Sequence, residues 1–187
     1  MRETSDVKEY MYSAIEESIL IHKDIIVYMY KGFERLLKFV GGLLYNSAKE
    51  AGRLMLKKMK EKGIVNDDNV LSALLESFVL AGYAEQITVK DVRLEKGKTI
   101  IEIEGKGLLL GSKLKSKRPV DQPLAGYMAG WLEEYYGAKT QAREIACTAR
   151  GDKACIILIE IKKPVPKIKE QLSKVFRRKE LLKSVVT

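Results

Sequence analysis

Residues 119–160 read PVDQPLAGYMAGWLEEYYGAKTQAREIACTARGDKACIILIE and hold both cysteines and the single tryptophan of this 187-residue chain. The pattern predicts a helix at 124–136 and two strands, at 141–149 and 154–161. A three-residue connection at 150–152, with Gly151 at positive φ, would set Cys147 directly across from Cys155. Cross-strand partners have Cβ atoms about 4.5–5.5 Å apart, so these two thiols are close enough to share a metal ion.

Two carboxylates are candidates for further ligands to such a metal. Asp121 lies between two prolines that keep the chain extended just before the helix. Glu144 precedes Cys147 by three residues, and strict strand alternation would send these side chains to opposite faces unless a bulge intervenes. The residues alone leave three alternatives open: a metal site, two buried apolar cysteines beside solvated carboxylates, or a cross-strand disulfide.

Three stretches make this region similar to the 4-vinyl reductase domain family. They are Pro119-Val120-Asp121 leading into Leu124 to Trp131, then Tyr136-Gly137, then Glu144-x-x-Cys147-x7-Cys155. The resemblance extends over residues 25–161. The family includes the phenol-sensing input domains of bacterial sigma-54 transcription activators and many stand-alone archaeal proteins.

In the phenol sensors, the family pattern implies a structural zinc held by a cysteine after Pro-Val, a glutamate and two cysteines. Glu144, Cys147 and Cys155 match this pattern by residue type, whereas Asp121 occupies the first cysteine position. An oxygen ligand in place of a thiolate makes the site harder. The resemblance therefore implies zinc at Asp121, Glu144, Cys147 and Cys155, in a structural role because four protein ligands leave no position for water.

The rest of the chain alternates between helical and strand periodicity. Helices are expected at 7–20, at 32–62 with a break at Gly41-Gly42, at 70–81 and at 168–185, and a hairpin joins strands at 87–94 and 99–104. Residues 24–30 are either a buried strand or an apolar segment leading into the next helix, and residues 105–111 are an edge strand or a flap. This order predicts an α+β fold, with an antiparallel sheet of four or five strands packed with helices.

Three parts are expected along the chain. They are an N-terminal amphipathic helix at 1–22, a ligand-binding domain at 23–161 and a basic C-terminal helix at 162–187, set off by two prolines. The apolar stripe of the first helix packs on the core or on a second copy of the chain, which favours a homodimer. The last helix docks on the sheet, on a partner protein or on an anionic membrane.

The chain carries a net charge of +9 and 46% hydrophobic residues. No run approaches the ~18–20 consecutive apolar residues of a membrane span, and the first residues lack the features of a signal peptide. We therefore expect a cytoplasmic protein with reduced thiols. Basic residues cluster at 57–62, 113–118 and 162–183. Such clusters are typical of solvated surfaces, and the middle one has no interleaved aromatic residues on which bases could stack.

The resemblance implies the fold of TRAPP vesicle-tethering subunits and nitric-oxide-sensing domains, which enclose an apolar cavity between sheet and helices. Gly126 and Gly130 leave one face of the helix at 124–136 nearly bare, so this face either packs closely on the sheet or borders a hollow. The candidate residues for lining an apolar pocket are Phe39, Leu43, Phe78, Tyr127, Met128 and Trp131.

Catalytic signatures are absent from the sequence, which has a single histidine, no Ser-His-Asp constellation and no nucleotide-binding glycine motif. We therefore expect a non-enzymatic module that binds or senses a small hydrophobic molecule and signals through a partner protein. The alternative is a nucleic-acid-associated regulator, or a partner-binding adaptor, that uses the basic clusters.

Overall fold

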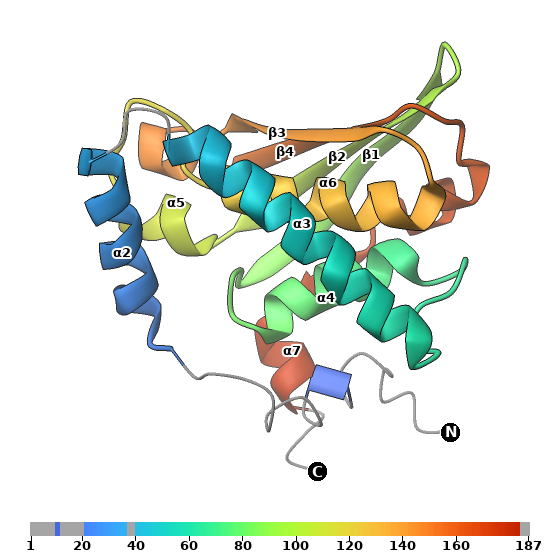
Figure 1. Cartoon of the computed structure of the whole chain (residues 1–187), viewed down its shortest axis with the longest axis horizontal. Helices are drawn as coiled ribbons and strands as arrows, with labels where there is room; N and C mark the ends of the chain where they lie inside the picture. The colour runs from blue at the N-terminus through green and yellow to red at the C-terminus, as the bar shows by residue number, and fades with distance from the viewer. Residues whose placement is uncertain (1–9, 12–20, 37–39, 184–187) are drawn as a thin grey trace.

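The computed structural model describes residues 10–11, 21–36 and 40–183 (Figure 1). The described helices are α2 (Lys23–Leu36), α3 (Val40–Glu61), α4 (Val70–Leu80), α5 (Leu109–Lys113), α6 (Gln122–Tyr136) and α7 (Arg178–Lys183). The strands are β1 (Gln86–Glu95), β2 (Lys98–Lys106), β3 (Thr140–Ala146), β4 (Cys155–Ile161) and β5 (Val175–Arg177), and two short 3-10 helices are η2 (Thr148–Arg150) and η3 (Pro166–Gln171). Of the helix predicted at 7–20, only Tyr10 and Met11 belong to the described residues.

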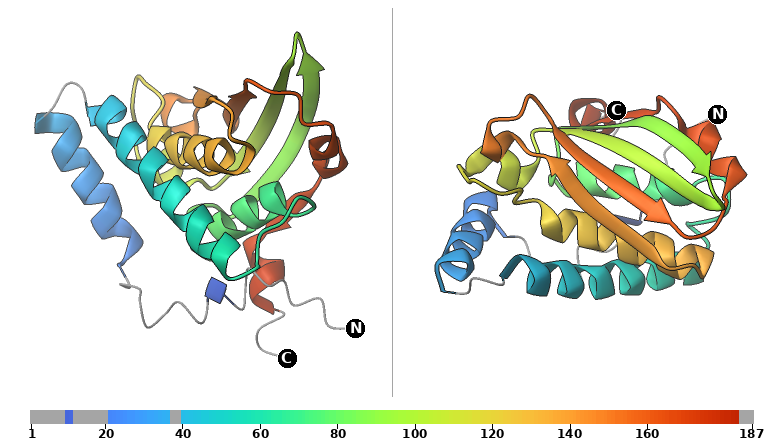
Figure 2. Two further views of the ribbon diagram at one scale, coloured as in Figure 1. Left: turned by 45° about the vertical axis from the view of Figure 1, so that its right-hand side comes forward. Right: turned by 90° about the horizontal axis from the view of Figure 1, so that it is seen from above.

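The five strands form one antiparallel sheet in the order β3-β4-β2-β1-β5, and α3, α4 and α6 lie on one of its faces (Figures 1 and 2). The predicted α+β class is therefore confirmed. The turn between β1 and β2 consists of Lys96 and Gly97, whose φ angles are 47° and 76°. A two-residue turn with positive φ at both positions matches the right-handed twist of the strands that it joins.

The core lies between the sheet and helices α4 and α6. Alternate strand residues point into it, including Ile87 of β1 and Ile101 and Ile103 of β2, which are at most 1% exposed. Most residues of α4 are buried, as expected for a helix that is apolar on nearly all sides. No helix among the described residues has both the length and the apolar composition needed to cross a membrane.

Helices α3 and α6 pack backbone against backbone. A Cβ atom added at Gly126 or Gly130 would overlap the carbonyl groups of Tyr45 and Lys49, and one added at Gly52 of α3 would overlap the backbone of α6. Only glycine lets two helices approach this closely. The bare face of α6 is therefore filled by α3, and it neither packs on the sheet nor borders a hollow.

Several predicted elements are wrong. Residues 24–30 are not a strand but part of α2, whose buried Val27 and Tyr30 are spaced by three residues, as a helix requires. Gly41 and Gly42 lie inside α3, so the helix break predicted at these two residues is wrong. The segment around Leu109 is the short buried helix α5 and not an edge strand.

The C-terminal segment is not the single helix predicted at 168–185. It divides into η3, β5 and α7, and β5 pairs with β1 as the edge strand of the sheet. Ile168 and Gln171 are buried, so this segment packs on the rest of the fold in spite of its many lysines. Strand β5 forms because it pairs with the free edge of β1. Its three residues are too few to show strand periodicity in the sequence.

Candidate metal centre and aromatic cluster

Four side chains from three separate segments converge at one end of the sheet. Asp121 precedes α6, Glu144 lies in β3, and Cys147 and Cys155 lie on either side of the turn between β3 and β4. One ligand atom from each residue lies within 4.8 Å of the others, and all four residues are buried. The structure thus brings together the complete set of sequence-predicted ligands in a cluster that could hold a metal ion.

A β-bulge aligns Glu144 with the cysteines. Glu144 pairs with Ile157 and Ala146 pairs with Ile156, so Ile145 is the extra residue on β3. The extra residue shifts the alternation of side chains by one, which lets Glu144 and Cys147 face the same point. The bulge required by the sequence argument is therefore present.

The connection between the cysteines differs from the predicted three-residue turn. The strands stop at Ala146 and start again at Cys155, and η2 lies between them. Gly151 has a φ of 97°, as expected for a glycine at the turn. The backbone N–H of Cys147 donates a hydrogen bond to Asp152 at 2.8 Å, which holds the turn closed.

Hydrogen bonds fix the ligands before any ion is present. The backbone N–H of Gly111 donates to Asp121 at 3.0 Å, and the N–H of Asp121 donates to Glu144 at 2.8 Å. The N–H of Thr148 donates to the sulfur of Cys155 at 3.3 Å, and the Thr148 hydroxyl lies at the same distance. Such second contacts orient the ligands of a metal site.

The cluster also contains an unsatisfied polar atom. Oε1 of Glu144 is buried and, among the described residues, has no hydrogen-bond partner. Leaving such an atom unpaired costs about 1–3 kcal/mol or more for a charged group. A Cβ atom at Gly111 would lie 2.7 Å from Asp121 Oδ2 and 2.8 Å from Cys155 Sγ, so a larger residue would crowd the ligands.

The protonation of the cluster reflects its burial. Burial raises the pKa of Asp121 to about 7, with a further rise caused by the neighbouring Glu144. Burial and the contact with Cys147 raise the pKa of Glu144 to about 8. The hydrogen bond from Cys147 lowers the pKa of Cys155, whereas the same contact and burial raise that of Cys147. The two buried carboxyl groups therefore hold protons to a higher pH than usual, and binding of a divalent cation would release these protons.

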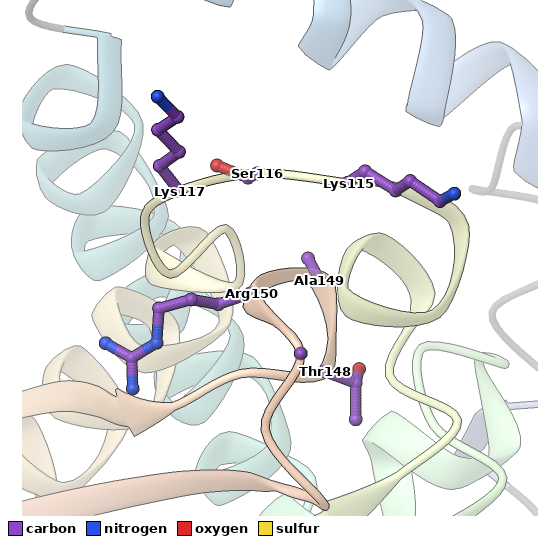
Figure 3. A pocket seen from close by; sticks show the side chains of 7 residues that line it. Lys115, Ser116, Lys117, Thr148, Ala149 and Arg150 are labelled. Atoms are coloured by element: carbon purple, nitrogen blue, oxygen red, sulfur yellow. The ribbon is translucent and has the colours of Figure 1, made fainter.

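An open surface hollow of about 500 Å³ is lined in part by Thr148, which contacts the sulfur of Cys155. Figure 3 shows the residues that line this hollow. It is lined by Lys115, Ser116 and Lys117 on the loop before Asp121 and by residues 148–151 of the turn between the cysteines. Both segments lead directly to metal-ligand candidates. The shape of this basic hollow therefore depends on how the cluster is held.

The predicted pocket residues fall into different places. Phe78, Met128 and Trp131 are at most 5% exposed, and Tyr127 is partly buried beside them. Leu43 is 58% exposed on α3 and does not lie with these four, and Phe39 is outside the described residues. The structure thus joins three of the six candidates, Phe78, Tyr127 and Trp131, in one contact cluster, and buries Met128 in the core.

Phe78, Tyr127 and Trp131 form a packed aromatic cluster. The ring of Tyr127 meets Phe78 edge to face at 5.1 Å between centroids and stacks with Trp131 at 6.4 Å. The indole N–H of Trp131 donates to the carbonyl of Val70 at 3.0 Å, which links α6 to α4. Tyr83, which is 41% exposed, meets Phe78 at 6.1 Å and brings the cluster to the surface.

Three residues of the site were not anticipated. Gly111 and Thr148 contribute backbone N–H groups, which nearly every residue type has, so residue type does not predict these hydrogen bonds. The sequence offered one indication, namely that Thr148 directly follows Cys147. Tyr30 of α2 is the third. Burial and the negative charges of Glu34, Asp121 and Glu144 raise the pKa of its hydroxyl to about 12, so this side chain interacts electrostatically with two of the ligand candidates.

Neither a family model nor a curated protein sequence matches the chain. In structure it is similar to the phenol-responsive sensory domain of the transcription activator PoxR with phenol. The TM-score is 0.69 and the identity 18%, over 86% of this chain and 92% of that one. It is also similar to a trafficking protein particle complex subunit 3 from Naegleria fowleri covalently bound to palmitic acid. There the TM-score is 0.56 and the identity 14%, over 75% of this chain and 95% of the other.

A vinyl-4-reductase family protein from Methanocaldococcus jannaschii also aligns, with a TM-score of 0.48 and 18% identity, over 86% of this chain and 96% of that chain. At identities of 18% and 14%, the first two comparisons establish a shared fold and leave the ligand open. The resemblance drawn from the sequence is confirmed at this level: the chain has the fold of a phenol-responsive sensory domain and of a trafficking protein particle subunit.

Proposed function

We propose that this protein is a non-enzymatic module that binds a small hydrophobic molecule and reports its presence to a partner protein. The observation that carries the proposal is the likeness to the PoxR sensory domain, which extends over 86% of the chain. The second neighbour, a trafficking subunit, was crystallised with palmitic acid. Two proteins of this fold that hold apolar ligands support a similar use here, although the ligand itself depends on local side chains.

The ligand site is the aromatic cluster on α4 and α6. Phe78, Tyr127 and Trp131 provide flat apolar surfaces, and aromatic rings prefer the edge-to-face and stacked arrangements seen among them. The exposed ring of Tyr83 marks the place where this cluster reaches solvent. The side chains inside the aromatic cluster are already in contact with one another. A ligand with one aromatic ring, or an acyl chain, would therefore have to displace Tyr83 or Tyr127 to enter the cluster.

Zinc is the metal that we assign to the cluster of Asp121, Glu144, Cys147 and Cys155. In a tetrahedral zinc site with ligand bonds of about 2.0–2.3 Å, neighbouring ligand atoms lie about 3.3–3.8 Å apart. The observed spread of 4.8 Å would close to this geometry with a small contraction. Thiolates favour zinc, and the unpaired Oε1 of Glu144 would gain a partner.

The role of the zinc would be structural. When bound, it would neutralise the crowded acids and tie the β3–β4 turn to the segment before α6. Four protein ligands leave no open position for a water or substrate, which is why we infer binding and not catalysis. The hydrogen bonds from Gly111 and Thr148 would keep Asp121 and Cys155 oriented toward the ion.

Titration with phenol and with palmitate tests the ligand. Trp131 is the only tryptophan and stacks on Tyr127, so its fluorescence reports on the cluster directly. We expect a saturable change with at least one probe, weakened in Tyr83→Ala and unchanged in Leu54→Ala, whose side chain is 59% exposed on α3. Absence of a saturable change with both probes, together with a bare mass in native mass spectrometry, would reject this function.

The expected homodimer and the signalling partner remain part of this proposal. The alternative, a nucleic-acid-associated regulator, is favoured by the basic hollow around Lys115 and Lys117. Retention of nucleic-acid probes that weakens steeply with salt would support that alternative, because binding driven by phosphate contacts depends on counterion release.

A further inference from the structure

Helix α2 exposes a continuous apolar stripe. Ile25, Tyr28, Met29 and Phe33 are 52, 70, 54 and 43% exposed, and Ile21 just before the helix is 48% exposed. These positions follow the spacing i, i+3, i+4, i+8, so they lie along one face of a helix about 21 Å long. Exposed apolar stripes of this size mark interaction surfaces.

The stripe is presented by a helix that is held in place. Val27 and Tyr30, on the opposite face of α2, are 5 and 8% exposed and belong to the core. Asp24 forms an ion pair with Lys113 of α5 at 3.6 Å. The exposed side chains therefore belong to a helix that is packed on the core. Helix α2 lies at one end of the molecule (Figures 1 and 2).

Basic residues border the stripe. Lys31 lies 5.5 Å from the centroid of the Tyr28 ring, and Arg35 follows it one turn later on the same edge of the helix. The loop that carries Lys115 and Lys117 lies at the same end of the molecule as α2, and both lysines line the open hollow (Figures 1 and 3). This end thus combines aromatic and aliphatic side chains with several cations.

We propose that α2 docks this protein onto a membrane surface that contains anionic lipids. The apolar stripe would enter the boundary between head groups and acyl chains, and the neighbouring lysines and arginine would contact lipid phosphates and carboxylates. Tyrosine suits this boundary because its ring is apolar and its hydroxyl tolerates the wet head-group region, and phenylalanine adds apolar surface.

Charge is the reason to prefer lipid over a second copy of the chain. Helix α2 carries Lys23, Lys31 and Arg35 beside Asp24 and Glu34, and Asp24 is already paired with Lys113, so two copies that met through α2 would bring an excess of positive charge together. The whole chain carries a net charge of +9. An anionic lipid surface offers the opposite charge and an apolar interior at once. The proposal concerns a surface separate from the aromatic cluster and does not depend on the ligand or on zinc.

Co-sedimentation with vesicles tests the proposal. The full chain is mixed with phosphatidylcholine vesicles and with vesicles in which about one-third of the lipid is phosphatidylserine. We expect binding to the anionic vesicles that is weakened about tenfold in the double variant Tyr28→Ser, Met29→Ser and about tenfold by raised salt. The matched control is Leu43→Ser, Leu54→Ser, which removes two side chains that are 58 and 59% exposed on α3 and should bind as the unmodified chain does.

Three outcomes would overturn the proposal. The first is no binding of the unmodified chain to anionic vesicles, and the second is equal binding by the α2 double variant, which would indicate attraction by net charge alone. The third is a dimer in light scattering that the same variant dissociates, which would identify a second copy as the occupant of the stripe. Circular dichroism on both variants shows whether each keeps the fold, and these exposed positions lie outside the core.

Discussion

Replacement of Gly130 by alanine is expected to push α3 and α6 apart. The added Cβ would overlap the backbone carbonyl of Lys49, and its distances to the carbonyl carbon and Cα of that residue would be 2.7 and 3.0 Å. The obstacle is main chain, which cannot turn aside as a flexible side chain can. The helices must therefore separate, or the site must distort.

The size of the effect follows from two opposing terms. Alanine in a helix interior is favoured over glycine by about 1 kcal/mol. Overpacking of a well-filled interface costs about 1–3 kcal/mol. We take the upper end of this range because the added Cβ clashes with main-chain atoms of Lys49. The net loss is then about 2 kcal/mol, which lowers Tm by about 4–8 °C in a chain of this length.

Thermal unfolding followed by circular dichroism measures this effect. The matched control is Gly32→Ala, because Gly32 lies inside α2 and a Cβ there would meet nothing within 4 Å. We expect the control to be stabilised by up to about 1 kcal/mol. If Gly130→Ala gained stability as the control does, the close contact of α3 and α6 would be refuted.

Three further predictions concern charged groups. Burial opposes the shift, but hydrogen bonds from Lys49, Thr140 and Arg53 prevail and lower the pKa of Glu133 from 4.5 to about 2. The stabilisation of the fold by ionised Glu133 is therefore complete above about pH 4.5 and is lost as the pH falls toward 2. In urea unfolding, Glu133→Gln should lower the free energy of unfolding by about 2 kcal/mol at pH 7 and by nothing near pH 2. A difference in stability between the two proteins that persisted near pH 2 would refute the ion pairing. The pKa values of Asp121 and Glu144 are raised from 3.8 to about 7 and from 4.5 to about 8, so the folded state keeps protons that the unfolded state has already lost. The Tm of chelator-treated protein should therefore fall as the pH rises from about 4 to about 8, whereas zinc should reverse the trend; a flat profile would contradict the burial of these acids. Asp121→Cys should bind zinc about tenfold more tightly in a competition with a chromogenic chelator, because thiolate is the softer ligand; weaker binding would place Asp121 outside the ligand set.

The sequence predicted those elements whose own periodicity is strong. Helix α4 and the β1–β2 hairpin fall within a residue or two of their expected ranges, because each buries one face or is buried throughout. Helix α2 and strand β5 were missed for a different reason. A short β-branched run such as 24–30 fits a strand or a helix, and β5 forms only because β1 has an edge left to pair.

The metal cluster was predictable in part. The spacing of Cys147 and Cys155 around a turn was enough to place the sulfurs together. The need for a bulge before Cys147 was visible in the sequence, but its position at Ile145 depends on the pairing of β3 with β4. The close packing at Gly111 depends on the tertiary contact of α5 with the turn, which no local pattern encodes.

The most direct test of the central claim is the zinc content of the purified chain. After reconstitution with zinc and gel filtration in buffer without chelator, elemental analysis should find one zinc per chain, and the Cys155→Ser variant should retain much less. If the unmodified chain carried no zinc, or if Cys155→Ser retained as much as the unmodified chain does, the assignment of Asp121, Glu144, Cys147 and Cys155 as a metal centre would be wrong.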